Sequence, residues 1–106
     1  MSEEQKFVGL ETIELNPSIL PLVITVDGNT LTEKYKNRLI HNFVWDLTSI
    51  DLAADGLPYI EVLPLGQNES VKVYNKDFYK SPDGIKFSYI KIPSGSQGLF
   101  TYYYGI

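Results

Sequence analysis

The hydrophobic and polar positions of the chain follow the pattern of short β-strands separated by turn residues. Apolar and polar residues alternate over short stretches, and no stretch sustains the spacing of an amphipathic helix. Pro, Gly, Asn and Asp punctuate the stretches at roughly regular intervals. The pattern predicts an all-β fold, an antiparallel β-sandwich of about seven or eight short strands, Ig-like or jelly-roll-like, with a barrel as the less favoured alternative. Strands are expected at 6–15, 20–26, 39–47, 59–63, 70–74, 85–92 and 99–106.

The strand expected at 39–47 has the clearest alternation. One of its faces carries most of its large apolar residues and is expected to face the core: Leu39, His41, Phe43, Trp45 and Leu47. Pro21 cannot donate a hydrogen bond to a neighbouring strand, so its strand is expected to begin late or to lie at a sheet edge. Gly9 is expected to mark a bulge, because the alternation of the first strand slips midway.

The end of the chain is expected to form a hairpin, with strands 85–92 and 99–106 joined by a Pro/Gly/Ser turn. The segment 75–84 before it is expected to be a connection anchored by Phe78 and Tyr79. Both faces of the last strand are apolar or amphipathic. Three interpretations stay open: a central strand with one face in the core, a contact with another subunit, or a stacking platform for sugar rings.

Length and composition indicate one domain, residues 6–106, after a polar arm at 1–5. The net charge of −4 argues against nucleic-acid binding, which requires a basic surface. The chain has no cysteine, which excludes disulfides, zinc–thiolate sites and thiol nucleophiles. No secretion signal and no apolar run long enough to span a membrane are visible, so we expect synthesis in the cytoplasm and no membrane partner.

Candidate chemistry is sparse. The single histidine, His41, lacks a partnered nucleophile and is better explained as a packing residue. Several aspartates precede glycine, as hairpin turns require. Asp51 and Asp55 could contribute to a calcium site, but no nearby residues complete the set of ligands, so turn chemistry explains the aspartates better. Glu61 and Glu69 could face each other across a hairpin, but two scattered acids do not indicate a glycosidase. We therefore predict no catalytic residue, cofactor or metal, and no enzymatic activity.

An N-glycosylation sequon, Asn68-Glu69-Ser70, is also present. Without a secretion signal, chance explains it best.

The segment from Ile90 to Tyr102, together with the ending Gly105-Ile106, resembles the closing strands of small β-sandwich virion proteins of tailed bacteriophages. These are capsid decoration (auxiliary) proteins and head or tail accessory proteins. The resemblance implies a non-enzymatic protein of the virion, made in the host cytoplasm. It would bind the major capsid protein or another virion protein, as a homo-oligomer or in many symmetric copies. The residues expected to bind the partner are Phe100, Tyr102, Tyr103 and Tyr104, together with Lys6, and the residues from Met1 to Lys6 are expected to become ordered on the partner.

The alternative is a carbohydrate-binding β-sandwich module or host-recognition domain. Such a module stacks sugar rings on exposed aromatic side chains, so it requires Trp45 and the tyrosines to be exposed and clustered. The alternation places Trp45 in the core instead.

Overall fold

The computed structural model describes residues 9–26, 38–49 and 58–105, and every regular element in these ranges is a β-strand. The eight strands are β1 (Gly9–Leu15), β2 (Leu22–Thr25), β3 (Leu39–Asp46), β4 (Tyr59–Pro64), β5 (Val71–Tyr74), β6 (Phe78–Lys80), β7 (Phe87–Ile92) and β8 (Gly98–Gly105). The strand count and the all-β class agree with the sequence pattern. The arm at 1–5 and Lys6 lie outside the described residues, as do Asp51 and Asp55.

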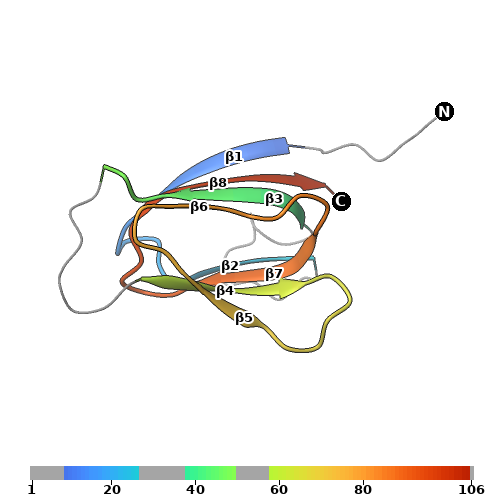
Figure 1. The fold of residues 1–106 in the computed structure, drawn as a ribbon. Helices are drawn as coiled ribbons and strands as arrows, with labels where there is room; N and C mark the ends of the chain where they lie inside the picture. The colour runs from blue at the N-terminus through green and yellow to red at the C-terminus, as the bar shows by residue number, and fades with distance from the viewer. Residues whose placement is uncertain (1–8, 27–37, 50–57, 106) are drawn as a thin grey trace.

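The strand pairing is that of one long hairpin rolled onto itself. β1 pairs with β8, β2 with β7, β3 with β6 and β4 with β5, all antiparallel. Rolling the hairpin adds two further antiparallel pairings, β3 with β8 and β4 with β7. The strand order is therefore β1-β8-β3-β6 in one layer and β2-β7-β4-β5 in the other (Figure 1).

This order is that of a jelly roll, so the structure decides between the two kinds of sandwich expected from the sequence. The backbone hydrogen bonds still join all eight strands into one sheet, because Ile40 of β3 pairs with Phe87 of β7. The sheet folds over at this pair.

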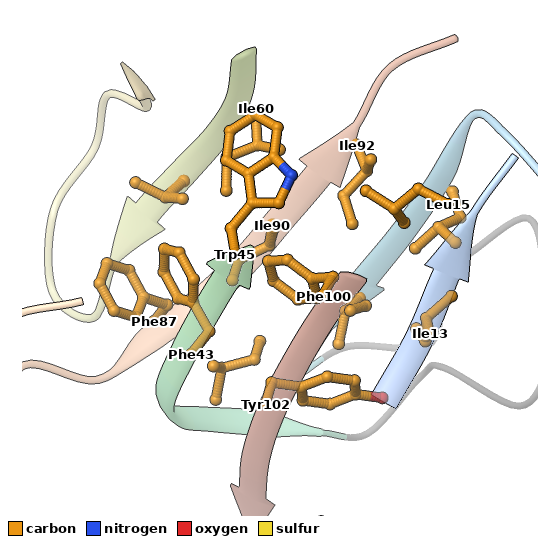
Figure 2. Packing of buried hydrophobic residues seen from close by; sticks show 14 of the residues in the cluster. Ile13, Leu15, Phe43, Trp45, Ile60, Phe87, Ile90, Ile92, Phe100 and Tyr102 are labelled. Carbon is orange, nitrogen blue, oxygen red and sulfur yellow. The ribbon is translucent and has the colours of Figure 1, made fainter. Parts of the chain in front are cut away.

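The core lies between the two layers, where inward-facing residues of all the longer strands meet (Figure 2). Phe43 lies at its centre, with ring centroids 5.2 Å from Phe100 and 5.4 Å from Phe87. Each fully buried side chain of this size stabilises the fold by about 1.5–3 kcal/mol through the hydrophobic effect. Among the described residues, the core consists of Ile13, Leu15, Leu22, Ile24, Ile40, Phe43, Trp45, Leu47, Ile60, Val62, Phe87, Ile90, Ile92, Phe100 and Tyr102.

The prediction of which side chains of β3 face the core is confirmed for the second half of the strand and wrong for its first half. Phe43 and Trp45 point into the core, but the buried residue before them is Ile40, and His41 is only half-buried. The register explains the change, since Ile40 lies opposite Tyr104 and Asn42 lies opposite the next residue, Tyr103. His41 is therefore the extra residue of a β-bulge, which shifts the alternation by one position.

The expected C-terminal hairpin does not form. β7 pairs with β2 and β4, whereas β8 pairs with β1 and β3 in the other layer. The segment 93–97 thus crosses between the layers rather than turning within one of them. The side chains of Trp45 and Ser96 hold this crossing in place, the first donating to the Gln97 carbonyl at 2.8 Å and the second to the Tyr59 carbonyl at 3.1 Å.

Three smaller expectations are also settled. β2 begins directly after Pro21 and, within the described residues, pairs only with β7, as a strand at a sheet edge does. The pairing of β1 with β8 is continuous, so Gly9 does not mark a bulge. The segment 75–84 is not only a connection, because it contains the short strand β6 paired with β3; in it Tyr79 packs against the core as expected, whereas Phe78 points outward.

Candidate functional site: the outer face of the β8 layer

The structure separates the aromatic residues that the sequence analysis assigned to partner binding. Phe100 and Tyr102 are fully buried between the layers, so they offer no contact area and the prediction is wrong for them. Tyr104 is half-buried and Tyr103 is exposed on the opposite face of β8. β8 itself lies between β1 and β3, as the central-strand interpretation requires.

The Tyr102 hydroxyl belongs to a partly buried network with two charged residues. Arg38 Nη1 donates to Glu11 Oε1 at 2.7 Å and also to the Tyr102 hydroxyl, which in turn donates to Glu11 Oε1 at 2.9 Å. The Arg38 guanidinium also lies over the Tyr104 ring, 4.1 Å from its centroid. A side chain at Gly9 would collide with the Tyr104 ring, so any larger residue there would displace this ring from its place beside β1.

This network closes one end of the core and fastens the edge strand β1 to β8. Burial, and then the negative charge of Glu11, raise the pKa of Tyr102 well above its ordinary value. The hydroxyl therefore keeps its proton and donates it in the hydrogen bond to Glu11. Sequence analysis missed the network because Glu11, Arg38 and Tyr102 are far apart in the chain and no local motif connects them.

The outward-facing residues of β1, β8, β3 and β6 form a continuous surface, here called the outer β8 face. Cross-strand register places Leu10, Tyr103 and Asn42 in one row across it, and Glu14, Leu99, Asp46 and Phe78 in another. Between these rows, the hydroxyls of Thr12 and Thr101 are hydrogen-bonded at 2.9 Å. Four large side chains on this face are substantially exposed: Leu10 at 53%, Phe78 at 52%, Leu99 at 41% and Tyr103 at 40%.

The charge of the outer β8 face is concentrated at one end. Glu14 and Asp46 lie in the same row, and hydrogen bonds from the Thr48 side chain and backbone lower the pKa of Asp46. Lys80 also lies on this face, with its ammonium 3.7 Å from an oxygen of Asp83. The two acidic side chains therefore lie in the same row as Leu99 and Phe78, and a row with Thr12 and Thr101 separates them from Leu10 and Tyr103.

The outward-facing residues of β2, β7, β4 and β5 form the opposite surface, called the outer β7 face. Register places Lys91 and Lys72 on the two sides of Glu61, so this face has an excess of positive charge. Tyr59 and Tyr74 meet edge to face, with ring planes at 70°, and Lys72 lies 4.7 Å from the Tyr59 ring centroid. Rings at this angle do not form a flat platform for a sugar.

Trp45 is 0% exposed, which contradicts what the carbohydrate-binding alternative requires of it. The remaining candidates do not converge on a site either. Glu61 lies opposite Lys72, so it does not face Glu69, which is in the exposed loop after β4 together with the sequon at 68–70. Within the described ranges, no three His, Asp or Glu side chains gather as metal ligands would. The same ranges contain no helix of the length and hydrophobicity needed to cross a membrane.

Comparisons of the chain with protein-family models, with curated proteins and with solved structures return no match. Its function is therefore inferred from its own residues and their geometry.

Proposed function

We propose that the protein is a non-enzymatic structural protein of a bacteriophage virion, of the decoration or accessory kind. It joins an assembled shell or tail in many copies and contacts a neighbouring protein through the outer β8 face. The observation that carries this proposal is the set of four large side chains, Leu10, Phe78, Leu99 and Tyr103, exposed together on one sheet face.

Single exposed apolar residues are ordinary on a protein surface, whereas several of them on one sheet face favour a contact surface. Leu99 and Phe78 lie in one row, at the two sides of Asp46, and Leu10 and Tyr103 are direct cross-strand neighbours. Aromatic residues are enriched at protein interfaces because the ring buries a large area at little entropic cost. The composition of this face therefore suits a protein partner.

The size of the face favours a partner that is itself repeated. With strands about 4.8 Å apart and about 3.4 Å per residue, four strands present roughly 20 Å by 20 Å, or about 400 Å². Stable pairwise interfaces bury about 800 Å² on each partner. A face of this size binds weakly by itself, and binding becomes strong when an ordered array presents many sites or when other contacts add to it.

The fold agrees with this proposal, although it does not establish it. Jelly rolls occur in viral capsid proteins and also in lectins, so fold alone leaves both hypotheses open. The buried Trp45 and the edge-to-face Tyr59–Tyr74 pair favour the structural role over sugar stacking.

The test is incorporation into particles of the phage whose genome encodes the chain. Tagged chains would be produced during infection, the particles purified by density, and the copy number measured by mass spectrometry. We expect the wild type to be present at a fixed copy number and the Leu10→Ser/Leu99→Ser variant to be strongly depleted. Leu65→Ser is the matched control, because Leu65 is 52% exposed but lies in the loop after β4. Absence of the wild type from particles, or normal incorporation of the double variant, would overturn the proposal.

A further inference from the structure

We infer that the neighbour on the outer β8 face is a second copy of this chain, which presents its outer β7 face. The inference rests on the proposed function in one respect, that the outer β8 face is a protein contact surface. It adds the identity of the partner and the surface that the partner uses.

The first reason is charge complementarity between the two faces. The outer β8 face has Glu14 and Asp46 at one end, whereas the outer β7 face has Lys72 and Lys91. Each face also carries one charge of the other sign, Lys80 on the outer β8 face and Glu61 on the outer β7 face, so an excess of one charge remains on each. Like faces would therefore repel each other, and unlike faces attract.

The second reason is that both faces are four-stranded and partly apolar. On the outer β7 face Tyr74 is exposed, while Tyr59 and Leu63 are half-buried and still reach the surface. Sheets with exposed apolar side chains pack face to face about 10 Å apart, with strand directions within about 30° of each other. Two copies stacked in this way would continue the layered arrangement that already exists inside each sandwich.

A contact between two different faces leaves one face of each kind open on every pair. Further copies can therefore add, and the assembly is a ring if the rotation closes and an open stack if it does not. Because each contact covers only about 400 Å² per copy, it is weak in dilute solution. Since charges contribute, it also weakens as salt is raised.

The experiment measures self-association of the purified full chain by sedimentation over a concentration series, at low and high salt. Glu14→Lys reverses charge on the outer β8 face and Lys91→Glu reverses it on the outer β7 face. Neither side chain takes part in a hydrogen bond or ion pair of the described structure. The matched controls are Glu69→Lys and Lys76→Glu, which change charge equally at exposed positions outside both faces.

We expect the wild-type chain to associate with rising concentration, and each single variant to associate at least about tenfold more weakly. An equimolar mixture of the two variants should recover the wild-type behaviour, because the lysine introduced in one copy then meets the glutamate introduced in the other. The controls should behave as wild type. Recovery on mixing distinguishes this interface from a general effect of net charge.

Three results would overturn the inference: no association at high concentration, association that ignores both variants, or single variants that are not rescued by mixing. These results are distinguishable from failure of the proposed function. A chain that enters particles through Leu10 and Leu99 but does not self-associate would keep its structural role, with a different virion protein on the outer β8 face.

Discussion

The bulge at His41 reverses which of two neighbouring residues, Ile40 or His41, should contribute more to the stability of the fold. If β3 alternated regularly, His41 would face the core and Ile40 would face solvent. In the structure Ile40 is 0% exposed and His41 is half-buried, with its Nε2 atom buried but without a hydrogen-bond partner. Alanine substitutions at these two neighbouring positions therefore separate the two arrangements.

The expected magnitudes follow from what each substitution removes. Ile40→Ala deletes three buried carbon groups at about 0.8 kcal/mol each and leaves a cavity, so it should destabilise by about 3 kcal/mol. His41→Ala removes no hydrogen bond of Nε2, because that atom makes none. It also relieves a buried unsatisfied polar group, so its net effect should stay within about 1 kcal/mol.

The assay is urea unfolding followed by the fluorescence of Trp45, the one tryptophan of the chain, which is fully buried in the fold. Emission should shift to longer wavelength on unfolding, and the two variants should share the wild-type dependence of stability on urea concentration. A His41→Ala variant that loses as much stability as Ile40→Ala would refute the bulge and restore the regular alternation.

Three further predictions concern the Tyr102 hydrogen-bond network, the pH dependence of stability, and two glycines, Gly95 and Gly98. Tyr102→Phe should lower the free energy of unfolding, measured with urea, by about 1.5–3 kcal/mol, because it removes a charge-assisted hydrogen bond to Glu11. In a Glu11→Gln background the same substitution should lower it much less. Burial, and then the positive charge of Lys86, lower the pKa of His41 below 6.5, so the unfolded chain binds a proton that the folded chain does not. The contribution of neutral His41 to stability should therefore be complete above pH 6.5 and be lost as the pH drops below that value. Thermal unfolding at several pH values should show a smaller loss in His41→Ala than in the wild type. Gly98→Ala should lower the free energy of unfolding by about 3 kcal/mol, because φ is +101° and the added Cβ would lie 2.5 Å from the Asp46 carbonyl oxygen. Gly95→Ala has a similar φ, +94°, but open space around the added Cβ, so it should lower the free energy of unfolding by only about 1–2 kcal/mol. Equal losses at the two glycines would contradict the close approach at Gly98.

Much of the fold can be predicted from the sequence because strand patterns are local. A strand with one buried face must alternate with period two, and turn residues must separate consecutive strands. This determines the all-β class, the β4–β5 hairpin and the burial of Phe43 and Trp45, all of which the structure has. The absence of cysteine likewise excludes disulfides without any structure.

What the sequence does not contain locally is which strands become neighbours. The segments 85–92 and 99–106 resemble a hairpin when considered alone, yet β7 gains two partners by pairing with β2 and β4 in the opposite layer. In the same way, only the tertiary structure brings Glu11 to Arg38 and Tyr102.

For the candidate site, too, the sequence predicts the local pattern of the strand but not its tertiary environment. Alternation correctly divides the aromatic residues of β8 into two sets, but it does not say which set is buried when both are apolar. The second layer decides this by covering Phe100 and Tyr102, which leaves Tyr103 on the outer β8 face beside Leu10. Sequence thus determines the strands and their two faces, whereas the packing of the layers determines which face meets the core and which is exposed.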